Sequence, residues 1–430
     1  MARVRFPAPY LFLLPLLYVP DLGFSRETPL GIIGPSDIVL VPLVLALLLG
    51  TSVRSGIPQA VRRLFLLFVA TAILSTLLFW LLRPGAFGYS KLLFSLNKIG
   101  KFSAYAILGL LVARRIRSVR DAELIFKSLA VGSVILALGI IMTAITKWEP
   151  GTLLIKKDLF PYKASNQISV VLASFGVFYA ILPRGADTRL RPRLILLAVL
   201  YASMLLTGGR GGWFGALIGC AYVIYATTRN RNGYVASAIL VVVATVMIVR
   251  LPAVRTRAED VVVVVDPVSG EERWGLDDGA RFDTWRHEGA KVLHAPLFGV
   301  GFFNRGQASG LWSSGSHNFY IQVALETGLV GLLVFFAMLL RIWRSVPLRA
   351  GPEVPGWLLQ HDLAFRAGLV TACAASMTGE YFYGGLVLGT LSMLYGTTVA
   401  CRRVVAGSGG SGAAADPVTA GIHALGGAGR

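Results

Sequence analysis

Residues 317–340 read HNFYIQVALETGLVGLLVFFAMLL, a long apolar run in which Glu326 is the only charged residue. At 1.5 Å per residue, a helix over such a run crosses the hydrocarbon core of a bilayer, which is roughly 30 Å thick. The run therefore predicts a membrane-spanning helix, and the rest of the chain can be interpreted outward from it.

Similar apolar runs recur on both sides of this one. Of the 430 residues, 55% are hydrophobic and 15% are charged, whereas about 25% are charged in a typical soluble domain. We expect an all-α polytopic membrane protein with about twelve transmembrane helices. Their expected positions are 8–20, 30–50, 62–82, 92–113, 123–146, 166–183, 194–207, 213–228, 234–250, 317–340, 363–380 and 385–401.

The arginines between these runs predict the orientation. Every second interhelical segment is short and contains arginine, and such segments face the cytoplasm. Both termini are then cytoplasmic, and the same bias explains the net charge of +19 without a nucleic acid partner. We expect four parts: helices 1–9 in residues 1–250, an outer loop with short helices in 251–316, helices 10–12 in 317–403, and a flexible cytoplasmic tail in 404–430.

The outer side is also basic, which the orientation rule does not require. Three of its basic residues, Lys156, Lys157 and Arg286, are candidates for substrate binding, and so are Lys98 and Lys101 inside the fourth expected helix. At 100° per residue, Lys98 and Lys101 share a helix face with Lys91, a stripe suited to guide a lipid phosphate. The alternatives are attraction to phospholipid headgroups and, for the stripe, snorkelling from a helix that begins later than expected.

A glycine-rich turn, TGGRGGW at 207–213, joins the seventh and eighth expected helices on the outer side. Glycines let the backbone approach a ligand closely, and the start of the following helix favours anions. Arg210 is suited to bind a phosphate through two parallel hydrogen bonds. The spacing differs from that of a P-loop, and a turn with a snorkelling arginine is the alternative.

The outer loop supplies a second arginine. A helix is expected from about Gly279 to about His294, because Pro296 and the glycines after it end the pattern. Arg281 and Trp285 are four residues apart, so they lie on one helix face and can stack. An amphipathic helix lying on the membrane surface is the alternative, and it is compatible with a functional role.

His317 lies where the outer loop enters the membrane helix. With Ser316 as the expected N-cap, the histidine falls in the first turn, where the helix dipole disfavours the imidazolium. A neutral imidazole can accept a proton from a hydroxyl group; an interfacial histidine without a role is the alternative. Glu326 lies about 13.5 Å further along the axis, on another face, so we expect it to pack or hydrogen bond inside the bundle. No spacing predicts a metal site.

Several motifs together resemble the O-antigen ligase and polymerase superfamily. They are the twelve expected spans, GGRGG at 208–212, Arg281 with Trp285, PLFGVG at 296–301, SHN at 316–318 and ETGLVG at 326–331. The resemblance implies a bacterial inner-membrane glycosyltransferase of the GT-C type. Such enzymes move a glycan from an undecaprenyl pyrophosphate carrier to an acceptor at the periplasmic face.

Within this superfamily, a ligase attaches O-antigen to the lipid A-core oligosaccharide, whereas a polymerase extends the glycan on its carrier. We favour a ligase, because the chain is compact and has one dominant outer loop. By resemblance, Arg210 and Arg281 bind the pyrophosphate, His317 activates the acceptor, and no cofactor is implied. A transporter of an anionic lipid or polysaccharide is the alternative from another class, although transporters place charges near the membrane midplane on broken helices.

Overall fold

The structure is a computed structural model of the full chain. It describes residues 10–18, 26–28, 31–33, 35–49, 54–82, 89–146, 165–181, 190–207, 209–228, 262–265, 272–275, 277–304, 317–348, 354–383 and 385–408.

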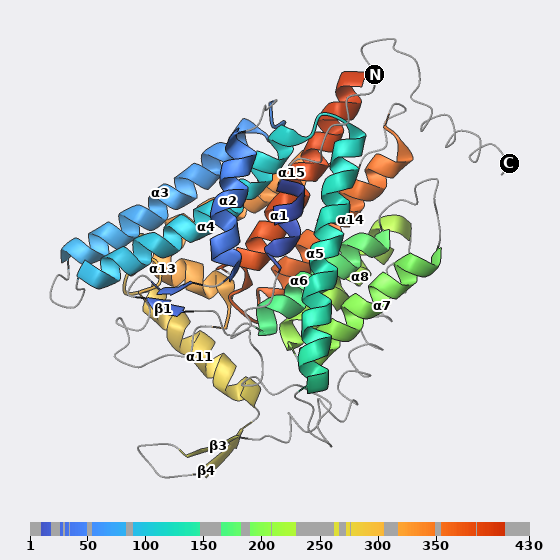
Figure 1. Cartoon of the computed structure of the whole chain (residues 1–430). Coiled ribbons are helices and arrows are strands. Elements are labelled where there is room, and N and C mark those ends of the chain that lie inside the picture. Colours follow the sequence, from blue (N-terminus) through green and yellow to red (C-terminus); the bar gives the residue numbers. More distant parts are fainter. Residues whose placement is uncertain are drawn as a thin grey trace.

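Helices make up most of the described chain (Figure 1). They are α1 (Tyr10–Leu16), α2 (Pro35–Leu49), α3 (Gln59–Leu82), α4 (Tyr89–Arg115), α5 (Val119–Thr146), α6 (Ser165–Ile181), α7 (Leu190–Leu206), α8 (Arg210–Thr228), α11 (Asp277–Val292), α13 (Phe319–Ser345), α14 (Gly356–Ala375), the 3-10 helix η2 (Tyr381–Tyr383) and α15 (Gly385–Ser408). Two short antiparallel hairpins, which the sequence did not predict, pair β1 (Arg26–Thr28) with β2 (Gly31–Ile33) and β3 (Val262–Val265) with β4 (Glu272–Gly275).

Every expected span contains a helix except 234–250, which lies outside the described residues. Two of the predicted spans are too long: residues 31–33 of the second form β2, and residues 376–380 of the eleventh form turns after the end of α14. Four of the described helices, α3, α4, α5 and α13, are long and apolar enough to cross a membrane, and α2, α6, α7 and α8 contain shorter apolar stretches. Large apolar side chains such as Leu66 and Leu333 are exposed on their outer faces, as a lipid environment favours. The chain is a multi-pass membrane protein; the full number of twelve crossings stays a prediction.

α4 and α15 pack along each other and approach closely at small residues (Figure 1). A Cβ at Gly396 would lie 2.0 Å from the carbonyl oxygen of Gly109, so only glycine fits there. The N–H of Gly109 donates to the hydroxyl of Ser392 at 2.8 Å, and this hydroxyl donates to the carbonyl of Ala106. Close packing of small residues is a main source of helix association in lipid, so this contact holds the C-terminal helix in the bundle.

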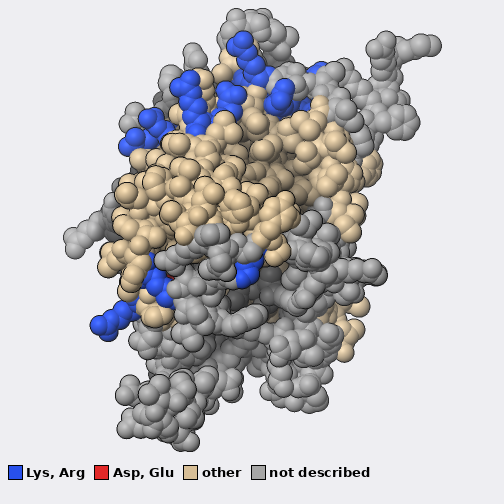
Figure 2. All heavy atoms as spheres, turned by 90° about the vertical axis from the view of Figure 1, so that its left-hand side faces the viewer, with Lys and Arg blue, Asp and Glu red and all other residues tan. Residues whose placement is uncertain are grey.

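Arginine side chains connect several helix termini at one end of the molecule. We call this the basic end; it comprises the start of α3, the last turns of α4 and α15, and the start of α14. Nε of Arg402 donates to Oδ1 of the buried Asp362 at 3.0 Å. Arg403 donates to the carbonyl of Ala113 at 3.2 Å and to that of Ile116. Figure 2 shows Lys and Arg gathered here, above a belt of uncharged residues. That this end faces the cytoplasm stays a prediction.

Candidate active site

The glycine-rich turn leads directly into α8, whose first residue is Arg210. The hydroxyl of Thr207 donates to the carbonyl of Met204 at 2.6 Å and accepts from the N–H of Gly209 at 3.2 Å. From α6, Ser169 donates to the carbonyl of Gly209 at 3.2 Å. The turn is therefore fixed by two helices. The helix begins at Arg210, three residues earlier than the predicted start at residue 213, so the backbone of Arg210 belongs to the first turn of α8.

Gly211 faces the segment that follows α14. A Cβ at this position would lie 2.2 Å from the hydroxyl oxygen of Tyr381 and 2.7 Å from that of Thr378. Only a glycine allows these hydroxyl groups to approach the backbone so closely. Sequence reasoning missed residues 376–381, because they form no motif and reach the turn only when α14 packs against α8.

His317 precedes α13 and has a left-handed backbone, with φ of +48°. The N-cap of α13 is Asn318, whose Oδ1 accepts from two N–H groups of the first turn at 3.0 and 3.2 Å. The prediction that Ser316 caps the helix, with His317 in its first turn, is wrong. The asparagine side chain satisfies the free N–H groups, and the chain turns sharply at the histidine before the helix begins.

A backbone hydrogen bond ties this corner to the segment after α14. The N–H of Phe319 donates to the carbonyl of Ser376 at 2.9 Å. Residues 376–381 therefore contact both the start of α13 and the glycine-rich turn. The fold thus brings Phe319, two residues after His317, and Gly211, next to Arg210, to one short segment, although they are distant in sequence.

Arg281 lies in the first half of α11, so the predicted helix in the outer loop is confirmed. The side chains of Arg281 and Arg210 are outside the described part of the structure. α11 packs against α13, and Val292 at its end contacts a small apolar cluster that includes Leu325. Arg286 is exposed on α11. The helix that carries both arginines therefore rests on the helix that His317 precedes.

α13 is interrupted at Gly328, whose φ of +70° and ψ of −177° are not helical. Residues 296–301 fill the interruption: two of their N–H groups donate to the carbonyls of residues 325 and 326 at 2.9 and 3.0 Å. In return, the N–H of Leu329 donates to the carbonyl of Pro296 at 2.8 Å. The exchange satisfies backbone groups that a break inside a membrane would otherwise leave unpaired. The motifs PLFGVG and ETGLVG thus form one structural unit.

Residues 194–336 contain the glycine-rich turn, α11, His317 and the interrupted part of α13, and they match the family model described as O-antigen ligase. The match assigns this segment to the O-antigen ligase family. The family predicted from the sequence motifs is therefore confirmed, and it suggests a ligase or polymerase-like enzyme. No curated protein matched the chain.

Lys98 and Lys101 lie in α4, outside the ligase-family segment, and both are half-buried. Nζ of Lys98 lies 5.2 Å from the ring centre of Phe94 and 5.3 Å from that of Phe303, contacts that stabilise a cation. α4 begins at Tyr89, earlier than expected, so snorkelling from a later helix start does not explain these lysines. Phe303 lies two residues after the ligase motif at 296–301, and Lys98 therefore contacts the segment that contains this motif.

Glu326 of the ligase motif is fully buried and accepts a hydrogen bond from Nε2 of Gln322 at 2.7 Å. The predicted hydrogen bond inside the bundle is confirmed. Ser75 of α3, which the sequence did not single out, joins the two ligase motifs. Its hydroxyl donates to the carbonyl of Glu326 at 2.6 Å and accepts from the N–H of Gly301 at 3.0 Å.

We expect Ser75→Ala to destabilise the fold by about 1–3 kcal/mol, because two buried hydrogen bonds worth about 0.5–1.5 kcal/mol each are lost. The matched control is Thr143→Ala, since the Thr143 hydroxyl bonds only to the Gly139 carbonyl of its own helix, at 2.7 Å. Thermal unfolding of both variants in one detergent measures the difference. Equal midpoints for the two variants would contradict the role assigned to Ser75.

Two predicted substrate-binding residues, a possible metal site and the cysteines remain to be placed. Lys156 and Lys157 lie outside them. No group of three His, Cys, Asp or Glu side chains that could hold a metal ion occurs in the described part of the chain. The three cysteines are free thiols.

Proposed function

We propose that the protein is an O-antigen ligase that transfers a glycan from undecaprenyl pyrophosphate to the lipid A-core oligosaccharide. The observation that carries the proposal is the match of residues 194–336 to the ligase family, together with the segment 376–381, which contacts the two motifs that bear Arg210 and His317. The interrupted helix α13 gives this corner of the molecule a fixed framework. A transfer between two bound substrates requires such fixed positioning.

The proposed reaction is a direct displacement. The acceptor hydroxyl oxygen forms a bond to the anomeric carbon of the donor sugar, and the bond from that carbon to the phosphate oxygen breaks. His317 takes the hydroxyl proton, and undecaprenyl pyrophosphate leaves with the bonding electron pair. Attack opposite the leaving group inverts the anomeric centre. Arg210 and Arg281 offset the charge that develops on the pyrophosphate, so no metal ion is required.

The geometry of His317 supports its role as the base. A histidine at positive φ is uncommon, and backbone strain of this kind concentrates at functional sites. The cap made by Asn318 and the bond from Phe319 to Ser376 fix the two residues that follow His317. Lys98, Lys101, Lys156, Lys157 and Arg286 are proposed to guide the anionic donor to this corner.

We place the reaction at the periplasmic face of a bacterial inner membrane, in a fold of the GT-C type. The proposal rests on the position of His317, at the opposite end of α13 from the basic end, where positively charged segments favour the cytoplasm. Residues 251–316 then form the periplasmic loop, both termini are cytoplasmic, and 404–430 is a cytoplasmic tail.

Reconstitution of the purified protein with a defined lipid-linked glycan tests the function. With lipid A-core as acceptor, a ligase yields a glycan joined to lipid A-core and free undecaprenyl pyrophosphate. A polymerase instead lengthens the glycan on its carrier when only the donor is supplied. If neither covalent product forms and the lipid-linked glycan merely changes leaflet, the protein is a transporter and the proposal fails.

We expect Arg210→Ala and Arg281→Ala each to lower the transfer rate by about 10²-fold or more, as does removal of one charge-stabilising donor in other enzymes. The control is Arg341→Ala, because Arg341 is exposed near the far end of α13. Initial rates in the reconstituted assay measure the effect. Near-normal rates in both site variants would refute the pyrophosphate role.

A further inference from the structure

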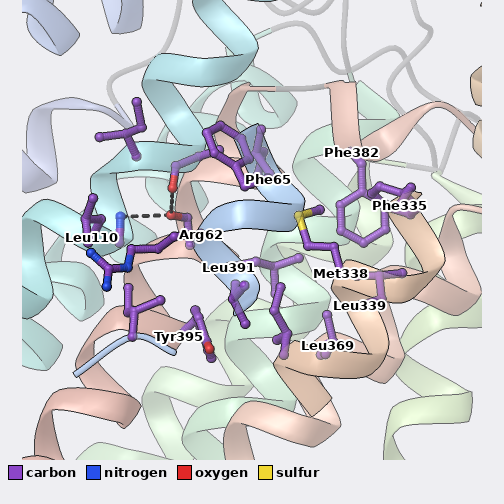
Figure 3. A pocket seen from close by; sticks show the side chains of 18 of the residues that line it. Arg62, Phe65, Leu110, Phe335, Met338, Leu339, Leu369, Phe382, Leu391 and Tyr395 are labelled. Atoms are coloured by element: carbon purple, nitrogen blue, oxygen red, sulfur yellow. Dashed lines mark hydrogen bonds between the residues drawn. The ribbon is translucent and has the colours of Figure 1, made fainter. Parts of the chain in front are cut away.

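An apolar cavity of about 400 Å³ lies in the half of the molecule nearer the basic end, between α3, α4, α13, α14 and α15. Its volume is within the range of small-molecule sites, about 300–1,000 Å³. The walls are aliphatic and aromatic, and they include Phe65, Leu110, Met338, Leu369 and Leu391 (Figure 3).

The two hydroxyl groups in the wall, those of Ser392 and Tyr395, are already paired. The Ser392 hydroxyl accepts from the N–H of Gly109 and donates to the carbonyl of Ala106. Tyr395 forms a hydrogen bond of 2.8 Å between its hydroxyl and that of Ser345. The interior therefore offers contacts to hydrocarbon and few to water, and water enters a cavity only where it finds several polar partners.

The two ends of the cavity differ. At one end lies Arg62, in the first turn of α3 at the basic end, and its side chain is exposed. Within the described chain, Arg62 forms no ion pair. At the other end lie Phe335 and Phe382 (Figure 3). Their rings are 5.1 and 5.2 Å from the ring of Phe319, the first residue of α13, so this end reaches the floor of the candidate active site.

We propose that this cavity holds one hydrocarbon chain of an anionic phospholipid whose phosphate group binds Arg62. In a membrane protein the surrounding solvent is hydrocarbon, so the lipid chain is held by van der Waals packing against the apolar wall and not by transfer out of water. Arg62 lies among other exposed arginines of the basic end, such as Arg63 and Arg114, and basic clusters attract anionic headgroups.

The position of Arg62 favours a phospholipid as the occupant of the cavity over the lipid carrier of the proposed reaction. The carrier must present its pyrophosphate near His317, whereas the charged end of this cavity lies at the opposite end of the bundle. A phospholipid in the leaflet at the basic end has its phosphate at the level of Arg62. Its chain then supports Phe335 and Phe382 from below. The choice of a phospholipid over the carrier rests on the proposed function, whereas the cavity and the position of Arg62 do not.

A photoreactive phosphatidylglycerol with a diazirine in one acyl chain tests the proposal on the full-length protein in phosphatidylcholine nanodiscs. After irradiation, we expect labelled peptides to come mainly from residues 57–66, 102–110 and 335–342, which line the cavity. Equal labelling of the exposed face of α2, at Ile38, Val41 and Leu45, would overturn the proposal, because it indicates ordinary boundary lipid.

Two substitutions separate the chain from the headgroup. Ala106→Leu fills the cavity, and we expect it to remove the labelling of 335–342. For Arg62→Gln we expect about a fivefold weaker competition by unlabelled phosphatidylglycerol, which corresponds to about 1 kcal/mol per basic residue. The matched control is Arg63→Gln, because Arg63 is exposed but does not line the cavity.

The outcomes are distinguishable even if Ala106→Leu does not fold. Labelling of the native protein locates the chain, and the exposed Arg62 and Arg63 variants report on the headgroup. Equal competition in both arginine variants, or unchanged labelling in a folded Ala106→Leu protein, would overturn the proposal. Stronger competition by undecaprenyl phosphate than by phosphatidylglycerol would also overturn it, since the cavity would then belong to the carrier.

Discussion

Replacement of His317 by alanine is expected to lower the rate of glycan transfer by about 10²–10⁴-fold, the usual effect of losing a general base. The left-handed backbone at this position, φ +48°, means that alanine changes both the base and the local conformation. His317→Asn separates the two effects, because asparagine tolerates this conformation but cannot accept the proton. Reconstituted transfer rates for both variants should fall by similar factors.

His294→Ala serves as the control for histidine loss on the outer side. His294 is exposed, and its Nδ1 lies 3.3 Å from the carbonyl of Ala290, so its removal should leave the transfer rate unchanged. If His317→Asn transfers at the normal rate while His317→Ala does not, the residue shapes the backbone and is no base. A normal rate in both variants would end the proposed mechanism.

Gly328→Ala is expected to prevent stable folding, or to lower the free energy of unfolding by about 2–6 kcal/mol. A backbone at φ +70° and ψ −177° is essentially restricted to glycine and costs another residue about 1–3 kcal/mol, and overpacking adds about 1–3 kcal/mol. The Cβ would lie 2.1 Å from the carbonyl oxygen of Leu297, so the two ligase motifs would have to separate. The yield of monodisperse protein and its thermal midpoint measure the effect.

The matched substitution is Gly100→Ala in α4, where a Cβ meets no atom within 4 Å. Alanine favours a helix over glycine by about 1 kcal/mol, so this variant should be as stable as the native protein or more so. A Gly328→Ala protein as stable as Gly100→Ala would show that the interruption of α13 is not a fixed feature of the fold.

The site divides into residues that the sequence predicted and residues that it did not. Arg210, Arg281 and His317 belong to local motifs, and local motifs are visible in one sequence. Ser75, Thr378 and Tyr381 are ordinary polar residues near helix ends or inside helices. Their contacts to Gly301 and Gly211 arise only when α3 and α14 pack against other helices, and no sequence spacing encodes that packing.

Two local expectations also depended on geometry. Ser316 and Asn318 are both good N-cap residues, and the choice between them depends on where the chain turns, which is at His317. The interruption of α13 was likewise not predictable from the local sequence. Gly328 in an apolar helix is compatible with a straight helix, and only residues 296–301, hydrogen bonded into the gap, make the break stable.

The sequence by itself determined the membrane class, the approximate positions of the described helices and the ligase family of residues 194–336. Hydrocarbon solvation acts on each apolar run separately, and the family motifs are contiguous. The tertiary structure alone decided which segments meet: the glycine-rich turn with residues 376–381, the two ligase motifs with each other, and the cavity beneath Phe382. These contacts join residues far apart in the chain, and they form because helix packing and backbone hydrogen bonding are satisfied together only in the assembled bundle.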